Sequence, residues 1–579
     1  MAIPARTIGV GQQDFGAIRE NNYFYIDKSD FIREWWEKGD FVTLITRPRR
    51  FGKTLNMSMV EQFFSVNYKG RADLFQGLRI WEYEGYRKLQ GTWPVISLSF
   101  ANIKEKDYTT MRRKICQILT EQYSKHSYLL DSGLLDEKEK DFFRGVSMDM
   151  DDVRATFSLY YLSDFLFRYY GKKVIILLDE YDTPMQEAYV DGFWDDLVAF
   201  TRSLFNAAFK TNPYLERAIM TGITRVSKES MFSDLNNLVV ITTTSEQYAD
   251  CFGFCENEVF DALEEYGLSD KRNEVKSWYD GFVFGSIQGI YNPWSIINYL
   301  RNKKLAAYWA NTSSNHLVGK LLREGKPNLK MNFERLLKGE TLDIVLDEQI
   351  VFNQLDRKES AIWSLLLAGG YLKVNAYRFE ERTGRTHYSL SLTNKEIRIM
   401  FENMVLDWFS DSEEEYNDFI RSFLKNDLKA MNIYMNRVAL STISYFDSGN
   451  QPSEYTEPER FYHGFVLGLM VELADRYTIA SNRESGFGRY DIMIEPKNSK
   501  DDAMILEFKV YDPDEEKTLE DTVNSALRQI EEKHYAAALI ARGIPEAHIR
   551  KYGFAFRGKK VLIGGGAAFG NRKEITGWN

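Results

Sequence analysis

The stretch Arg47-Pro48-Arg49-Arg50-Phe51-Gly52-Lys53-Thr54 follows an apolar run at residues 41–46 and precedes a helical pattern that begins at Leu55. Strand, loop and helix in this order are the context in which Gly-Lys-Thr indicates a phosphate-binding loop. Backbone N–H groups at the start of the helix would face the phosphates. Lys53 would reach the β- and γ-phosphates, and the Thr54 hydroxyl would hold Mg²⁺. The stretch therefore predicts a site for ATP and Mg²⁺.

Position 47 departs from the usual pattern G-x-x-x-x-G-K-[ST], because Arg47 stands where the first glycine is expected. On this stretch alone, a basic loop before an ordinary helix is a competing interpretation. The residues of the stretch predicted to contact the nucleotide are Arg49, Arg50, Phe51, Gly52, Lys53, Thr54 and Leu55.

An acidic strand end further along the chain supports the ATP site. Residues 174–178 are five consecutive apolar residues, and Asp179 and Glu180 follow them directly. Such a run is typical of a buried parallel strand. Asp179 can orient the Mg²⁺ shell, and Glu180 can act as general base on the attacking water. The alternative is a core strand that ends in an ordinary acidic turn, and the presence of both motifs in this order disfavours it.

Two more apolar runs, 93–100 and 218–223, also read as strands separated by helical segments, which predicts a parallel sheet with helices on both faces. Ligands bind such sheets beyond the carboxyl ends of the strands. Thr224 and Arg225 follow the second run and fit a sensor position near the γ-phosphate, although ordinary turn residues fit equally well. The arginines that could neutralise charge in the transition state are Arg47, Arg49, Arg50 and Arg225; which of them would face a neighbouring subunit is open.

Composition sets bounds on the class of protein. The 579 residues suggest several domains, and the formal net charge of −10 means that nucleic acid would have to bind a local basic patch. With no secretory segment and no apolar run near about 18 residues, we expect a soluble cytoplasmic protein without membrane contact. The three cysteines are too few for a disulfide framework or a cysteine-only zinc site.

Changes of pattern predict four regions. Residues 1–264 form a P-loop ATPase domain, and residues 265–395 a helical, winged-helix-like lid with aromatic turns. Residues 396–458 read as a helical connector, which ends at 447–458 in a linker rich in Ser, Gly, Pro and acids. Residues 459–579 form a second α/β domain.

A second site for chemistry lies in a predicted hairpin of this last domain. The first strand, 490–494, follows a glycine-containing turn and carries Asp491; the second, 503–510, contains Glu507-Phe508-Lys509. Side chains alternate along a strand, so Glu507 and Lys509 share one face and Phe508 lies on the other. Two carboxylates and a backbone carbonyl make an oxygen site for Mg²⁺, or Mn²⁺, and Lys509 can serve a water that attacks a phosphodiester. A solvated hairpin with a surface ion pair is the alternative.

Other residues of this domain can complete the site. Gln529 on the following helix could orient the water or a carboxylate, and Glu459, His463 or Glu484 could complete the metal shell. The basic residues expected to bind DNA are Arg489, Lys551, Arg557, Lys559 and Lys560.

Residues 47–54, 178–184 and 221–228 resemble the bacterial AAA-ATPase-like family, in which arginine at the position of Arg47 looks habitual. Residues 481–509 resemble the PD-(D/E)XK nuclease domain commonly fused to that ATPase. The resemblances cover most of the chain and imply a P-loop ATPase joined to a restriction-endonuclease-like fold. One position departs from RecB-like nucleases, which place Gln-x-x-x-Tyr on the following helix: Lys533 stands four residues after Gln529.

The leading hypothesis is an ATP-hydrolysing protein with a Mg²⁺-dependent DNA nuclease domain, which forms a nucleotide-dependent homo-oligomer and acts in defence against foreign DNA, repair or mobile-element biology. One alternative is a regulatory ATPase whose C-terminal domain binds nucleic acid without cleaving it. Another is a scaffold whose assembly ATP controls. The set Asp491, Glu507 and Lys509 favours the nuclease, because a binding module does not need all three.

Overall fold

The computed structural model describes residues 5–224, 232, 235–310, 316–346, 355, 358–410, 413–446, 456–482 and 490–566. The chain divides into two compact units, Met1–Ser314 with Thr341–Arg398, and Asn315–Glu340 with Ile399–Asn579. None of the described helices has the length and apolar character that crossing a membrane requires.

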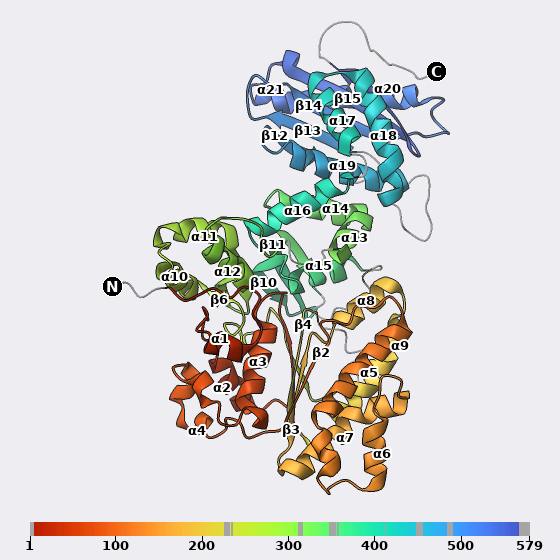
Figure 1. Ribbon diagram of the computed structural model, residues 1–579. Helices are drawn as coiled ribbons and strands as arrows, with labels where there is room; N and C mark the ends of the chain where they lie inside the picture. The colour runs from red at the N-terminus through yellow and green to blue at the C-terminus, as the bar shows by residue number, and fades with distance from the viewer. Residues whose placement is uncertain are drawn as a thin grey trace. The chain divides into compact units, whose positions relative to one another are not determined.

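A five-stranded parallel sheet forms the centre of the first unit, with strand order β2-β3-β4-β1-β5 (Figure 1). Its strands are β1 (Val42–Thr46), β2 (Val95–Ser99), β3 (Val174–Asp179), β4 (Leu215–Gly222) and β5 (Leu238–Ile241). β1 and β3 are buried along their whole length, as their apolar runs predict. Because β4 lies between them, its carboxyl end stands between the phosphate loop and the acidic end of β3.

Helices cover both faces of this sheet. Phe15, Trp35 and Phe63, from α1, α2 and α3, share a core with Ile175 and Leu177 of β3. α5, α7 and α9 lie on the opposite side (Figure 1). The helices are α1 (Phe15–Glu20), α2 (Asp30–Lys38), α3 (Lys53–Phe64), α4 (Glu84–Arg87), α5 (Tyr108–Lys125), α6 (Glu137–Gly145), α7 (Asp152–Tyr170), α8 (Thr183–Asp191) and α9 (Trp194–Phe205).

Two small antiparallel sheets complete the first unit. The first, in the order β6-β8-β7, accompanies α10, α11 and α12. The second has the order β10-β11-β9, with β9 before α15 in the chain and β10 and β11 after it. The bounds are β6 (Phe254–Cys255), α10 (Glu256–Glu265), α11 (Arg272–Tyr279), β7 (Asp280–Phe284), β8 (Ile287–Tyr291), α12 (Pro293–Asn302), β9 (Leu342–Val345), α15 (Glu359–Ala368), β10 (Leu372–Glu380) and β11 (Arg385–Leu392).

The second unit is built on a mixed sheet in the order β12-β13-β14-β15-β16, in which only β14 and β15 run parallel. Its strands are β12 (Tyr477–Asn482), β13 (Tyr490–Pro496), β14 (Ala503–Val510), β15 (Ile549–Arg557) and β16 (Lys560–Gly566). Its helices are α13 (His316–Glu324), α14 (Pro327–Leu337), α17 (Glu413–Lys425), α18 (Leu428–Phe446), α19 (Thr456–Glu472), α20 (Leu519–Glu532) and α21 (Ala536–Ala541), while α16 (Lys395–Asp407) begins in the first unit and continues into the second.

The two faces of this sheet pack against different helices. Phe508 of β14 contacts the rings of Tyr462 and Phe465 of α19. On the other face α20 lies so close to β15 that a Cβ on Gly553 would stand 2.8 Å from the carbonyl oxygen of Val523. Since Gly553 is paired in register with Glu507, the α20 side is the side of the predicted catalytic residues.

The helical segment before residue 447 belongs to the second compact unit and packs on its sheet. Asn432 and Asn436 of α18 each exchange two hydrogen bonds with the backbone of β16, at Ile563 and Val561 respectively. These side-chain amides take the place of a neighbouring strand and cover the edge of the sheet. Most of the predicted linker, residues 447–455, lies outside the described residues.

Candidate nucleotide and nuclease sites

The predicted phosphate loop joins β1 to α3, which begins at Lys53. Gly52 caps α3 with a φ of 81°, a conformation that glycine adopts without strain. Nothing lies within 4 Å of a Cβ built on Gly52, so backbone conformation, not space, favours glycine here. The unpaired N–H groups in the first turn of α3 face the end of β1, as an anion site at a helix N-terminus requires.

Lys53 is held at the centre of this loop. Its side chain is buried, and Nζ donates hydrogen bonds of 3.1 Å to the carbonyl oxygens of Arg47 and Pro48. Nζ also lies 3.5 Å from Oε1 of Glu180. The fold therefore brings the predicted phosphate-binding ammonium next to the predicted general base.

Asp179 accepts hydrogen bonds from two threonine hydroxyls. Thr54 Oγ1 donates to Oδ2 over 2.7 Å, and Thr221 Oγ1 of β4 donates to Oδ1. Burial, followed by repulsion from Glu180, raises the pKa of Asp179, and the two hydroxyls oppose this shift. Thr54 and Asp179, which the sequence predicted to bind the metal together, are thus in direct contact. Thr221 was not identified from sequence, because its contact with Asp179 depends on β4 lying beside β3.

Glu180 is one of the few described non-glycine residues with positive φ, at 53°. This conformation is strained for an L-residue, and such strain is concentrated at functional sites. Hydrogen bonds to Thr221 hold it: the Glu180 N–H contacts Thr221 Oγ1 over 3.4 Å, and the Tyr181 N–H contacts the Thr221 carbonyl over 2.9 Å.

Thr224 is placed differently from the predicted sensor. Its side chain is fully buried, and both its N–H and its Oγ1 donate to Oδ2 of Asp182 over 2.8 Å. It does not line the cleft described below. Thr224, which follows β4, instead holds the carboxylate of Asp182. Burial, and then repulsion from Glu180, raises the pKa of Asp182. Arg225 lies outside the described residues.

Arg47 is not available to a nucleotide, which corrects its inclusion among the charge-neutralising arginines. Its guanidinium is buried and donates to the carbonyl oxygens of Thr46, Thr242, Gln247 and Tyr248, at 2.6–3.3 Å. Burial lowers the pKa of Arg47 to about 10, so it remains charged at neutral pH. Arg47 has a structural role, because its guanidinium donates hydrogen bonds to backbone carbonyl oxygens in the loop after β5.

A cleft of about 510 Å³ opens over the phosphate loop. All the predicted contacts from Arg49 to Leu55 line it, as do Asp179 and Glu180. Further residues that line the cleft were not identified from sequence: these are residues 9–13 apart from Val10, and Phe24, Ile26, Phe254, Pro293, Trp294 and Ile297. An aromatic turn at 291–295 was evident in the sequence, but nothing local relates it to the phosphate loop.

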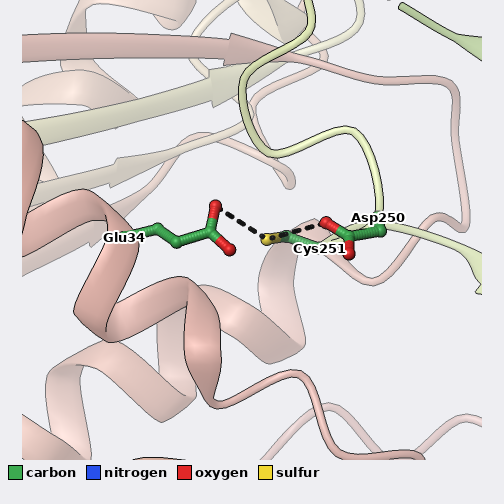
Figure 2. Close-up of side chains that lie close together, drawn as sticks. All are labelled: Glu34, Asp250 and Cys251. Atoms are coloured by element: carbon green, nitrogen blue, oxygen red, sulfur yellow. Dashed lines mark hydrogen bonds between the residues drawn. The ribbon is translucent and has the colours of Figure 1, made fainter. Parts of the chain in front are cut away.

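Cys251, which lines the cleft, belongs to a thiol–carboxylate cluster that Figure 2 shows. Cys251 Sγ is 3.8 Å from Oε2 of Glu34 and 3.8 Å from Oδ1 of Asp250. Burial, and then the negative charges of Glu34 and Asp250, raise the pKa of the Cys251 thiol well above its usual value. The protonated sulfur is therefore a neutral donor in this cluster, and all three cysteines of the chain are free.

In the second unit, the strand register places Asp491 of β13 directly opposite Glu507 of β14. Glu507 is 0 % exposed, and neither carboxylate oxygen accepts a hydrogen bond within the part of the chain that the structure describes. A buried carboxylate that accepts no hydrogen bond is unfavourable unless a cation or a proton neutralises its charge. This environment fits a divalent cation. The Asp491 side chain, Arg489 and Glu484 lie outside what the structure describes.

Lys509 lies two residues after Glu507 on the same strand and contacts α20. Its Nζ donates to Ser525 Oγ over 2.9 Å. Gln529 is one helical turn after Ser525 and hence on the same side of α20. Exposed basic residues gather at the β15–β16 turn, namely Arg557, Lys559 and Lys560. Lys551, by contrast, is paired with Glu531 at 2.9 Å.

Comparison with known proteins matches these two units with two families. Residues 9–232 match the family model described as predicted AAA-ATPase, and residues 457–565 match the PD-(D/E)XK nuclease superfamily. The chain is thus similar to a predicted AAA-ATPase in its N-terminal part and to the PD-(D/E)XK nuclease superfamily in its C-terminal part.

One similar protein is an uncharacterised protein encoded in the 5′ region of vnfD in Azotobacter chroococcum mcd 1. It is 25 % identical over 560 residues, which cover 93 % of this chain and 95 % of that protein. The similarity therefore extends through both domains.

Proposed function

We propose that this protein hydrolyses ATP in its first unit and cleaves nucleic acid, with DNA as the preferred substrate, in its second. The observation that carries the proposal is that each unit gathers an acidic pair and a lysine whose positions suit phosphate chemistry. Defence against foreign DNA, repair or mobile-element biology would each use such a combination.

The proposed ATP site assigns a role to each polar side chain. Lys53 and the first turn of α3 bind the phosphates, and Thr54 with Asp179 holds Mg²⁺. When bound, Mg²⁺ would neutralise the charge of the phosphates. Glu180 accepts the proton of the attacking water, and its contact with Lys53 keeps the carboxylate beside the phosphate loop until nucleotide enters. Arg49 and Arg50 line the same cleft and are the described arginines that can supply further positive charge.

The proposed nuclease site uses Glu507 and Asp491 to hold Mg²⁺ or Mn²⁺. Lys509 positions the water, and Ser525 holds the ammonium over this face of the sheet. Gln529 can assist from the next turn of α20. The burial of Glu507 supports this reading over a surface ion pair, because an exposed pair would leave the carboxylate in contact with water.

The test uses the purified full chain with linear, circular and single-stranded DNA, with Mg²⁺ or Mn²⁺, with and without ATP. We expect Glu507→Ala to abolish cleavage while ATP hydrolysis persists. We expect Glu180→Gln to keep ATP binding but slow hydrolysis by about 100-fold or more, and Lys53→Ala to lose binding. Glu495→Ala in β13 and Lys88→Ala on the surface are matched controls for the two sites.

Two results contradict the proposal separately. Hydrolysis within twofold of wild type in both Lys53→Ala and Glu180→Gln removes the ATP assignment. If the wild type cuts no substrate and calorimetry detects no metal uptake, the nuclease assignment fails and the regulatory ATPase becomes the better account.

A further inference from the structure

The β10–β11 hairpin carries a surface that neither proposed site uses. Its strands pair from Leu372 opposite Leu392 to Glu380 opposite Arg385, with the turn at 381–384. Among the described strands, only β11 has a second neighbour, β9, and that pairing ends at His387. Within the described residues, the outer half of the hairpin is therefore a two-stranded ribbon.

Two aromatic side chains stand out from this ribbon. Tyr377 is 73 % exposed and Phe379 is 57 % exposed, the highest values for aromatic residues in the described part of the chain. They are two positions apart and hence on one face of β10. Burying such rings is favourable, so large exposed aromatic side chains that lie together on one surface indicate a binding site.

The same hairpin is basic, although the whole chain is acidic. From 373 to 386 it carries four basic residues against two acidic ones, in a chain with a net charge of −10. Glu380 already lies 3.5 Å from His387 and 3.9 Å from Arg382. Arg378 and Arg385 are exposed and have no ion pair among the residues that the structure describes. Strand alternation places Arg378, and Arg385 opposite Glu380, on the other face of the ribbon from the two rings, so the ribbon offers flat rings on one face and guanidinium groups on the other.

We propose that this hairpin binds nucleic acid whose bases are unpaired. Tyr377 and Phe379 stack on bases at one face of the ribbon, while Arg378 and Arg385 contact phosphates from the other face, where the strand passes around the edge of the ribbon; aromatic stacking combined with positive charge is how single strands are held without sequence preference. A second copy of this chain fits less well, because two basic hairpins would repel each other. The binding surface is independent of the C-terminal nuclease site.

The base of the hairpin contacts the phosphate loop. A Cβ on Gly370, two residues before β10, would lie 2.7 Å from Cγ of Pro48. Thr393, just after β11, donates to the Gly370 carbonyl over 2.7 Å. Tyr371 packs on the ring of Trp309, whose Nε1 donates to the Arg49 carbonyl over 2.9 Å. We therefore expect nucleic acid on the hairpin to change ATP hydrolysis, an expectation that rests on the proposed ATPase function.

The binding test uses a fluorescent oligo-dT strand and the full chain in EDTA, so that no cleavage occurs. The double variant Tyr377→Ala/Phe379→Ala should bind at least about tenfold more weakly, since each stacked base contributes about 1–3 kcal/mol. Arg378→Ala/Arg385→Ala should bind more weakly and with a smaller salt dependence. Tyr169→Ala, another exposed aromatic residue of the first unit, should bind like the wild type.

A strand containing iododeoxyuridine locates the contact directly. Photocross-links that map to residues 372–392 support the proposal, and cross-links confined to residues 457–565 overturn it. Wild-type affinity in Tyr377→Ala/Phe379→Ala also overturns it. If that variant keeps its affinity but loses self-association in light scattering, the surface belongs to a second copy.

Hydrolysis of ATP with and without oligo-dT then tests the link to the phosphate loop. The wild type should change its rate by at least about twofold, and Tyr377→Ala/Phe379→Ala should keep its basal rate without responding. A wild type that binds the strand but does not respond overturns the link. A wild type that hydrolyses no ATP contradicts the proposed function and leaves the binding result intact.

Discussion

At the residue scale, the contacts of Arg47 explain why arginine can replace the first glycine of the predicted phosphate loop. The side chain points into the protein, donates to four carbonyl oxygens and lies over the rings of Phe284 at 4.7 Å and Phe252 at 5.7 Å. The guanidinium fork satisfies several acceptors at once, which lysine cannot do. The buried Arg47 side chain therefore supports the conformation of the loop.

We expect Arg47→Gly, which restores the usual motif, to destabilise the protein. It removes a buried side chain and leaves carbonyl oxygens without donors, at a cost of about 3 kcal/mol or more. The measurement is the urea midpoint of unfolding, with Arg79→Ala, a largely exposed arginine, as control. A midpoint equal to that of the wild type would show that the contacts of Arg47 stabilise nothing.

At the element scale, the N-terminal turn of α16 connects several parts of the first unit. Glu396 accepts hydrogen bonds from Ser295 Oγ at 2.8 Å and from the N–H groups of Trp309 at 2.6 Å and Ala310 at 3.4 Å. Trp309 in turn holds the Arg49 carbonyl of the phosphate loop. Burial outweighs these hydrogen bonds and raises the pKa of Glu396 to about 7.

This raised pKa predicts a pH dependence of stability. The folded chain keeps the Glu396 proton up to about pH 7, whereas an unfolded chain releases it near about pH 4.5. The stabilisation is therefore complete below about pH 4.5 and is lost as the pH rises through about 7, by about 3 kcal/mol at most. We expect Glu396→Gln, which imitates the protonated form, to reduce the fall of the unfolding midpoint between about pH 5 and 7.5. Glu381→Gln, at an exposed position, should leave that fall unchanged; an unchanged fall in Glu396→Gln would refute the assignment.

At the scale of the whole molecule, the proposed ATP site lies entirely within the first unit and the proposed nuclease site entirely within the second. α16 is the continuous element that begins in one and ends in the other. We therefore expect a substitution in one unit to leave the proposed activity of the other unit unchanged.

We expect nucleotide to promote self-association. P-loop ATPases can complete their sites with an arginine from a neighbour. Light scattering of Glu180→Gln with a non-hydrolysable ATP analogue should show a higher mass than without nucleotide, and Lys53→Ala should show no change. A monomer mass in Glu180→Gln under both conditions would contradict the prediction.

The sequence alone determined the features whose residues lie close together in the chain. The phosphate loop, the acidic strand end at 174–180 and the shared face of Glu507 and Lys509 follow from local spacing, because β-strand alternation and helix starts are set by neighbouring residues. The two family resemblances rest on the same short segments, and the family models match both regions.

The tertiary structure alone decided which distant segments meet. That β4 lies between β1 and β3 makes Thr221 a partner of Asp179 and turns Thr224 toward Asp182. The direction of Arg47 depends on carbonyls some 200 residues away. Local patterns cannot encode these roles, because a buried polar side chain turns toward whichever acceptor the packing leaves without a partner, and that is known only once the whole fold has formed.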